Sequence, residues 1–344
     1  MLTNKSLPKT ILLIVLLLAT LTYLISMDNR QRLLQSSWQE SRPMMGTIVS
    51  ITVRGIDKDL AQQAFKTAFD KAYQIEQRIS TYQKQSEITA INNHFKTSTK
   101  PFKISKSMAD LMQTSFQYSQ TTSGAFDITV KPLINLWRKA KKDKKLPDQD
   151  LINHLKPTTF NNGAHINNLI LQAPIGTSFD FGAIGKGYTA DIIATVLESL
   201  GIYNYLIDVG RDLLVRGEDA PWRIGIQDPL IKDKSIQTLI VRKKIAIATS
   251  GDYEQKYKIG THILTHIINP NTGWPIKNIA GATVIAPTGS QADAFATAFC
   301  ILPPQKSLNL ANQLSDFKIL ILQHQNKKIK AYYSKNWQKQ NTND

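Results

Sequence analysis

The sequence of 344 residues contains a single cysteine, Cys300. One thiol excludes an intramolecular disulfide and a zinc site built from several thiolates. Cys300 lies in the apolar run 298–302, so we expect a small buried side chain rather than a reactive thiol. The chain also lacks internal repeats, low-complexity tracts and any Gly/Pro-rich linker after residue 45. Its length therefore suits one large domain, or two interlocked ones, with a substantial core.

Acidic residues are scarce beside basic ones, 26 against 42, which gives a formal net charge of +16. Such an excess suits nucleic acid, a membrane surface or an anionic ligand, and composition does not choose among these. The basic run at residues 138–145 contains no aromatic side chain of the kind that stacks on single-stranded nucleic acid. We interpret this run as a solvated face or loop and expect no nucleic-acid partner.

The N-terminal segment holds a long apolar run at residues 11–25, preceded by Lys5 and Lys9. This run is short for a membrane-spanning helix and long for the core of a signal peptide. Because positive flanks stay on the cytoplasmic side, the rest of the chain is expected on the periplasmic side of the inner membrane. No clear cleavage site follows, which favours an uncleaved signal anchor at residues 1–27 over a secreted product. Residues 28–43 are expected to form a tether.

Helices and strands alternate irregularly along the rest of the chain. Apolar residues at helical spacing predict helices over residues 59–79, from 107 onward, 188–200 and 291–302. Period-two patterns predict strands over 47–54, 205–209, 223–227, 238–242, 244–248 and 262–268, and a closing hairpin of 317–323 with 328–333. Strands without strict strand-helix-strand order indicate an α+β fold with largely antiparallel sheets rather than a doubly wound sheet.

Asp293 and Thr297 lie four residues apart on the last expected helix. At this spacing both side chains leave the same face, so their oxygens can meet one hard cation such as Mg²⁺. The alternative is structural, since aspartate often caps a helix start and a helical threonine often bonds back to a carbonyl.

The glycine-rich segment from Asp180 to Tyr188 carries three glycines just before an expected helix. Glycines allow close approach of the backbone, and amide groups at a helix N-terminus bind phosphate, with Lys186 adding a cation. The pattern is neither a Walker loop nor a dinucleotide fingerprint. A tight turn needed for packing is the alternative.

Two further segments are candidates for a binding site. Ser123–Thr129 and the later Asn135-Leu-Trp137 place small residues beside an aromatic ring and a carboxylate, which could line a planar ring of a ligand, or could form a turn and core. His266 precedes a turn, where a histidine most often has a structural partner.

Taken in order, these segments resemble the ApbE family of FAD:protein FMN transferases. The resemblance spans residues 44–302, and the ordered set is specific although each motif alone is weak. It rests on Met45-Gly-Thr47, Ser80-Thr-Tyr82, Ser86-Glu87, Asn92, Ser123–Asp127, Leu136-Trp137, Asp180–Tyr188, Trp222–Pro229, Thr249–Tyr253, His266–Gly273 and Ala292–Thr297.

The resemblance implies one α+β flavin transferase domain over residues 44–335, with FAD in a cleft and a polar tail at 336–344. By motif match, the residues expected to contact FAD are Met45, Tyr82, Ala125, Phe126, Asp127, Asp180, Lys186 and Ile268. Mg²⁺ is expected to be held by the side chains of Asp293 and Thr297 and the carbonyl of Ala183.

The implied reaction is transfer of FMN from FAD to a threonine hydroxyl of an acceptor protein, with release of AMP. Asp293 would hold the catalytic metal, and His266 is the candidate general base. Acceptors in the family are outward-facing subunits of redox complexes of the Nqr and Rnf type. The alternatives are an FAD pyrophosphatase that uses water in place of threonine, and a non-catalytic flavin-binding envelope protein.

The sequence departs from the family pattern in two places. The family usually shows two adjacent glycines after the strand at 205–209, whereas here Gly210 is followed by Arg211. We expect this cation to narrow the cleft or to contact a phosphate. The lipid-attachment cysteine common in the family is replaced by the apolar N-terminal run.

Overall fold

The computed structural model describes residues 13, 17–18, 20–23, 35–156, 163–218, 220–227, 235–251, 256–325 and 328–337. Most of the expected anchor at 1–27, Pro229, Asp252 and Tyr253 lie outside these residues. No helix within the described part of the chain is both long and apolar enough to cross a membrane.

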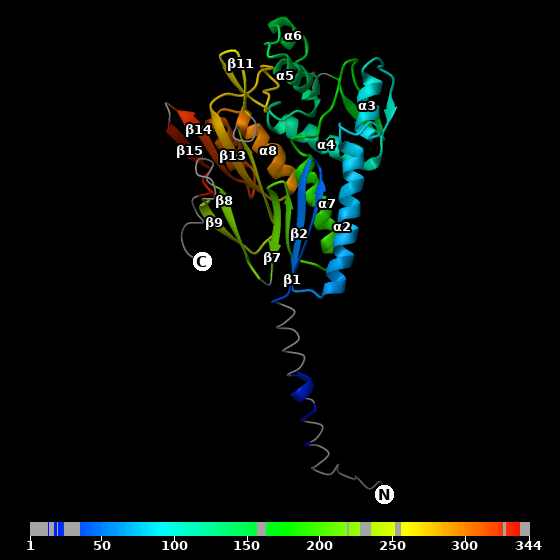
Figure 1. Cartoon of the computed structure of the whole chain (residues 1–344), viewed down its shortest axis with the longest axis vertical. Coiled ribbons are helices and arrows are strands. Elements are labelled where there is room, and N and C mark those ends of the chain that lie inside the picture. Colours follow the sequence, from blue (N-terminus) through cyan, green and yellow to red (C-terminus); the bar gives the residue numbers. More distant parts are fainter. Residues whose placement is uncertain are drawn as a thin grey trace.

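An eight-stranded antiparallel sheet forms the centre of the molecule (Figure 1). Its strand order is β1-β2-β6-β7-β10-β13-β14-β15. The strands are β1 (Ser37–Met44), β2 (Thr47–Arg54), β6 (Asn204–Val209), β7 (Asp212–Gly217), β10 (Ile245–Gly251), β13 (Ile279–Ala286), β14 (Lys318–Gln325) and β15 (Lys328–Tyr333). Successive side chains of β10 enter two different cores, since Ala246 and Ala248 pack on one face and Ile247 on the other. The α+β prediction is confirmed.

Three long helices cover one face of this sheet: α2 (Lys58–Ile79), α7 (Gly185–Ser199) and α8 (Gly289–Ile301). Helix α2 shows why the sequence folds locally in this way. The Asp57 side chain caps its start by accepting from the Leu60 N–H at 2.8 Å. Its apolar stripe, which includes Phe65, Ala68, Phe69 and Ala72, is buried against the sheet and α7.

A hairpin of β8 (Trp222–Gln227) and β9 (Ser235–Val241) covers the opposite face. Trp222, Ile224 and Leu239 form a second core there with Val215, Ile247 and Leu320 of the large sheet. The sheet is thus buried on both sides between a helical layer and a hairpin layer.

The remaining elements lie around these layers. They are α3 (Glu87–Phe95), α4 (Lys106–Thr121), the 3-10 turn η1 (Ile128–Val130), α5 (Lys131–Asp143), α6 (Gln149–His154), α9 (Pro304–Gln313), β3 (Phe102–Lys103), β4 (His165–Asn167), β5 (Ile170–Gln172), β11 (Lys256–Ile259) and β12 (His262–Thr265). A third core, which includes Leu133, Trp137 and Leu264, joins α5 to β11 and β12 at one end of the molecule.

Several expected boundaries differ from the structure. Residues 37–43 of the expected tether form most of β1, whose ladder with β2 pairs Ser37 with Arg54. In the expected polar tail, Trp337 is buried against the hairpin-side core. The expected strand at 262–268 ends at Thr265, and Ile268 makes an isolated bridge with Pro275. Residues 37–43 pair with β2, and Trp337 packs on the hairpin-side core. The polar sequence of these two segments did not predict either contact.

Candidate active site

The first turns of α7 and α8 touch through their backbones. A Cβ atom added to Gly187 would lie 2.0 Å from the carbonyl oxygen of Gly289, so only glycine fits there. Asp191 of α7 accepts hydrogen bonds from the N–H groups of Gly289 and Ser290 at 2.6 and 2.8 Å. A side chain of one helix therefore caps the start of the other and fixes the two termini together.

This contact places Asp293 against the glycine-rich segment. The Gly187 N–H donates to Oδ2 of Asp293 at 3.0 Å, and the Asp293 side chain is buried. One helical turn later, Thr297 Oγ1 lies 3.2 Å from Ser250 Oγ of β10. Ala183, Asp293 and Thr297 line the same cavity.

We name this space the helix-end cavity; its volume is about 460 Å³. It gathers ten of the twelve residues expected to act in the site: Tyr82, Phe126, Asp127, Asp180, Ala183, Lys186, His266, Ile268, Asp293 and Thr297. These residues come from segments far apart in the sequence, and their convergence supports a single site.

Met45 and Ala125 are the two expected FAD contacts outside the lining of this cavity. Ala125 is 1% exposed and packs in the main core. Met45 occupies the β1–β2 turn with φ of 56°, and its amide donates to Glu76. Its methyl carbon lies 3.6 Å from the position of a Cβ built on Gly185, so Met45 packs beneath the start of α7.

The start of α7 suits an anion. Ile184 occupies the N-cap position and makes no side-chain capping hydrogen bond. The Gly185 N–H donates to the carbonyl of Phe181 and the Gly187 N–H to Asp293, so an anion would be attracted by the positive end of the helix and by the charge of Lys186 rather than by a row of open amides. Lys186 Nζ also lies 2.6 Å from Oδ2 of the buried Asp212. That carboxylate ties the lysine to the β6–β7 turn.

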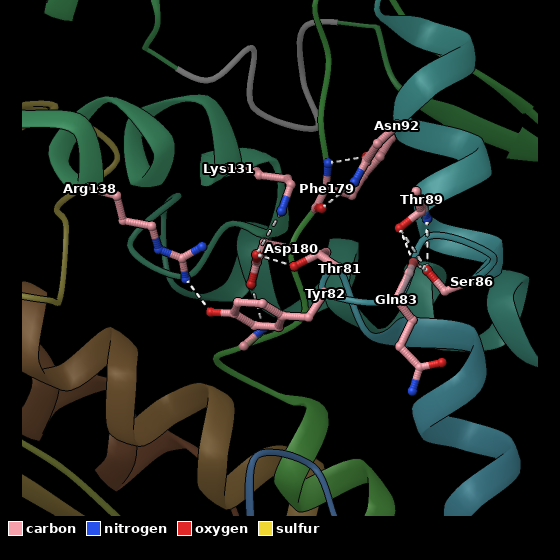
Figure 2. A network of polar contacts seen from close by, with 11 residues as sticks. Thr81, Tyr82, Gln83, Ser86, Thr89, Asn92, Lys131, Arg138, Phe179 and Asp180 are labelled. Carbon is pink, nitrogen blue, oxygen red and sulfur yellow. Dashed lines mark hydrogen bonds and ion pairs between the residues drawn. The ribbon is translucent and has the colours of Figure 1, made fainter. Parts of the chain in front are cut away.

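Asp180 lies at the centre of a polar network on the cavity wall (Figure 2). Its carboxylate accepts from the Gly182 N–H at 2.9 Å, from Lys131 Nζ at 3.3 Å and from Thr81 Oγ1 at 3.4 Å. Lys131 belongs to α5, so this ion pair joins α5 to the glycine-rich segment. Next to it Tyr82 is 79% exposed. Its hydroxyl accepts from Arg138 Nη2 at 2.8 Å.

Asp127 lines the cavity, and its carboxylate is buried. Its Oδ1 accepts from the N–H and hydroxyl of Thr129 at 2.8 and 2.7 Å, whereas Oδ2 has no hydrogen-bond partner among the described residues. Burial raises the pKa of Asp127 to about 6, against the hydrogen bonds from Thr129. An N–H donor of a bound ligand would satisfy this oxygen.

The donor set at Asp293 fits a hard divalent cation. One carboxylate, one hydroxyl and one carbonyl oxygen match the preference of Mg²⁺ for few protein oxygens together with water or phosphate oxygens. No group of three His, Cys, Asp or Glu side chains suited to a metal occurs among the residues that the structure describes. A site for zinc or another metal that needs several such side chains is therefore not found in that part of the chain.

The basic side chains of the run at 138–145 are exposed, as expected, on the last part of α5 and just after it. Arg138 and Lys141 also line the helix-end cavity. Arg211 does not line that cavity; it lines a second one on the hairpin side of the sheet. The expected narrowing of the cleft by Arg211 is therefore wrong.

Sequence reasoning missed Ser250, Tyr257 and the α5 cations as parts of the cavity wall. A signal for α5 was present, because Leu133, Trp137 and Ala140 recur at helical spacing and are buried. The many lysines around these three residues obscured the apolar pattern of the helix. Trp137 Nε1 donates to the carbonyl of Gly273 at 2.8 Å, which joins α5 to the His266–Gly273 segment.

Comparisons with known proteins identify the family of this chain. The ApbE family model matches residues 45–321. A FAD:protein FMN transferase of Escherichia coli K12 is 35% identical over 275 residues, covering 76% of this chain and 78% of that protein. One from Vibrio cholerae is 30% identical and covers 86% of this chain and 90% of that protein. The solved structure of flavin transferase ApbE from Vibrio cholerae superposes with a TM-score of 0.75 at 28% identity, over 88% of this chain and 99% of that one. On the family match, the identity to these relatives and the shared fold, the chain belongs to the ApbE family.

Proposed function

We propose that this protein transfers FMN from FAD to a threonine hydroxyl of an acceptor protein, in a reaction that requires Mg²⁺ and releases AMP. The observation that carries the proposal is the meeting of Asp293, Thr297 and Ala183 with the uncapped start of α7 in one cavity. An oxygen-lined cation site beside the positive end of a helix and a lysine is the arrangement that a pyrophosphate substrate needs. The names of the relatives give the same reaction class.

Different residues of the chain are proposed to bind different parts of FAD and the metal. The positive end of α7 and Lys186 bind the pyrophosphate of FAD. Asp127 accepts an N–H of one ring system, and Phe126 and Ile268 supply apolar contacts. Tyr82, held by Arg138, closes the exposed side of the cavity. Ala183, Asp293 and Thr297 hold the metal.

The chemistry is an in-line displacement at the phosphorus on the FMN side. Mg²⁺, when bound, neutralises negative charge on the pyrophosphate and on the departing AMP. His266 is exposed at the cavity wall, where an incoming hydroxyl can reach it. It takes the proton of the acceptor threonine as the bond from oxygen to phosphorus forms and the bond to AMP breaks.

The acceptor is proposed to be a threonine-bearing subunit of an Nqr-type or Rnf-type redox complex. The first 27 residues are proposed to anchor the chain in the inner membrane, with the domain on the periplasmic side. Lys5 and Lys9 before the apolar run support this orientation.

An assay of covalent flavin tests the proposed reaction. The protein is incubated with FAD, Mg²⁺ and a purified Nqr-type acceptor subunit, and the acceptor is examined by in-gel flavin fluorescence while FMN and AMP are measured. We expect a fluorescent acceptor and one AMP per flavin attached. Free FMN with an unlabelled acceptor would favour the pyrophosphatase. An intact FAD pool would favour a non-catalytic flavin-binding protein.

Two substitutions in this assay test the metal site. Asp293→Asn retains an oxygen that can accept from Gly187 but removes the negative charge, and Asp293→Ala removes both. We expect each to lower transfer by about 100-fold or more, because a ligand to the metal is lost. Unchanged transfer in the folded Asn variant would count against the metal site.

His266→Ala tests the base. Transfer is expected to fall by about 100-fold, which is within the range for loss of a general base, while the FAD dissociation constant stays within about twofold. Equal losses of transfer and of FAD affinity would assign His266 to binding instead.

A further inference from the structure

A second cavity of about 230 Å³ lies between the large sheet and the β8–β9 hairpin. We name it the hairpin cavity. Its wall is mainly apolar, with two threonines, two glycines and one pair of opposite charges at Asp208 and Arg211. The apolar and small residues are Leu213, Ile224, Gly225, Ile226, Ile247, Thr249, Gly281, Thr283, Leu320 and Leu322.

Thr249 of β10 lines both the hairpin cavity and the helix-end cavity. The two spaces therefore adjoin at one residue although they lie on opposite faces of the sheet. The next residue, Ser250, contacts Thr297 of the proposed metal site. A molecule in the hairpin cavity that contacts Thr249 is therefore close to Ser250 and to the proposed metal site.

The sheet topology explains how the two faces communicate there. The ladder of β10 with β13 runs from Ala246 to Gly251, but its ladder with β7 ends at the pair of Ile247 with Leu213. Strand β7 begins at Asp212, so beyond Ile247 the neighbour of β10 on this side is the β6–β7 turn. The sheet narrows at this point, next to Thr249, which lines both cavities.

Charged residues of both cavities lie at or next to the β6–β7 turn. Lys186 reaches Asp212 from the helix-end cavity, and Arg211 lines the hairpin cavity. Burial raises the pKa of Asp208, while the positive charges of Arg211 and Lys186 oppose that shift. Asp208 lines the hairpin cavity, and its Oδ1 accepts from the Arg211 N–H at 2.7 Å.

We propose that the hairpin cavity holds an extended segment of the acceptor polypeptide, whose threonine enters the helix-end cavity past Thr249. The inference rests on the proposed transfer reaction. Main chain of β10 beyond its ladder with β7 offers an edge for such a segment. The apolar wall suits small or apolar side chains next to the threonine.

The rival occupant is one end of FAD itself. FAD carries a pyrophosphate, and the anion-binding features of the molecule lie at the start of α7 in the other cavity. Among the residues that the structure describes, the wall of the hairpin cavity has one cation, Arg211, beside the carboxylate of Asp208. A space of about 230 Å³ corresponds to about seven or eight water molecules, which suits two or three side chains better than a nucleotide.

Filling the cavity tests the proposal. Leu322 is half-buried in the wall, and Leu322→Trp in the full chain should occupy part of the space. Leu206→Trp is the matched control, because Leu206 packs on the same side of the sheet but does not line the cavity. The acceptor probe is the purified Nqr-type subunit, with its KM for transfer and the FAD dissociation constant both measured.

We expect Leu322→Trp to raise the acceptor KM by at least about tenfold and to leave the FAD dissociation constant within about twofold. The control should change neither. An unchanged KM overturns the docking proposal, and an equal loss of FAD affinity assigns the cavity to FAD. If the wild-type protein attaches no flavin to the acceptor, the proposed function itself fails, and the docking proposal fails with it.

A crosslinking variant covers the case in which tryptophan prevents folding. Cys300 is 1% exposed, so Leu322→Cys adds an accessible thiol that can carry a benzophenone maleimide. Illumination should crosslink the acceptor to this variant and not to Leu206→Cys. Equal crosslinking by both variants, or none by Leu322→Cys, contradicts the proposal.

Discussion

The buried carboxylate of Asp127 lowers the free energy of unfolding at neutral pH, because it is ionised there without full solvation. Its folded-state pKa of about 6 lies above the ordinary value of 3.8 because the side chain is desolvated. A raised carboxyl pKa contributes stability that is present below about pH 4 and lost as the pH rises through about 6. The full difference corresponds to at most about 3 kcal/mol.

Asp127→Asn is therefore expected to raise the free energy of unfolding by about 1 to 2 kcal/mol at pH 7.5. The advantage should shrink toward zero at pH 4, where the wild-type carboxyl is largely protonated in the folded state. Urea unfolding at both pH values measures this. The same variant should bind FAD more weakly, because an acceptor oxygen is lost. An advantage that persists unchanged at pH 4 would show that the ionisation of Asp127 is not its source.

Arg211 occupies a backbone conformation that favours glycine. Gly210 and Arg211 connect β6 to β7 with φ values of 60° and 73°, as in a two-residue hairpin turn of type I′. A non-glycine residue at the second position is strained. The charge of Arg211 beside Asp208 offsets part of this strain.

Arg211→Gly is expected to raise the free energy of unfolding by about 0.5 to 1 kcal/mol, measured by urea unfolding at pH 7.5. Its FAD dissociation constant should not change, because the side chain lies outside the helix-end cavity. Lys144→Gly provides the comparison for the effect of backbone strain on stability, since Lys144 has φ of 52° at the exposed end of α5. A loss of stability in Arg211→Gly alone would mean that its pairing with Asp208 outweighs the backbone strain.

At the scale of elements, the contact between α7 and α8 brings together the residues of the candidate active site. Gly187 and Asp293 are 106 residues apart in sequence, yet the close approach of the two helix starts joins them by a hydrogen bond. The contact brings Asp293 and Thr297 of α8, the proposed metal ligands, next to the start of α7. The first turn of α7 is therefore both a packing surface and part of the binding site.

Gly187→Ala is expected to separate the two helix starts, because its Cβ would lie 2.0 Å from the carbonyl oxygen of Gly289. We expect a loss of about 2 to 3 kcal/mol in the free energy of unfolding and a loss of Mg²⁺-dependent FAD binding. Unfolding and FAD titrations with and without Mg²⁺ measure both effects. Thr195→Ala, on the exposed face of the same helix, should change neither. Normal Mg²⁺-dependent FAD binding in Gly187→Ala would contradict this role for the contact.

Elements with a clear period were predictable, and those without one were not. Helix α2 and the strands β2 and β6 follow apolar patterns that the sequence displays. Strand β13 was missed because every one of its residues is buried, so no alternation of polar and apolar residues exists. Strand β7 was missed for a related reason, since both of its faces are covered.

At the scale of the whole molecule, the chain enters the domain far from the helix-end cavity. Strand β1 runs from Ser37 to Met44, and Met45 then packs beneath the start of α7. Eight extended residues span about 26 Å. Figure 1 shows the first residues of β1 at the end of the sheet opposite α5 and β11. An acceptor threonine would therefore be modified well away from the proposed membrane anchor.

Cell fractionation tests the anchor. The full chain is expected in the membrane fraction, whereas a chain that begins at residue 35 should be soluble, because the apolar run is lost. Both should bind FAD with the same affinity, since the first residue of β1 is Ser37. Recovery of the full chain in the soluble fraction would contradict the anchor at residues 1–27.

The sequence by itself determined the α+β class, most regular elements and the ordered motifs of the family, because these depend on local periodicity and residue type. Only the tertiary structure decided that Asp293 meets Gly187, that α5 supplies cations to the cavity and that Arg211 faces the other side of the sheet. Those facts depend on contacts between residues far apart in the chain. Local patterns carry no information about such contacts, because they arise from the pairing order of the strands and the crossing of two helices.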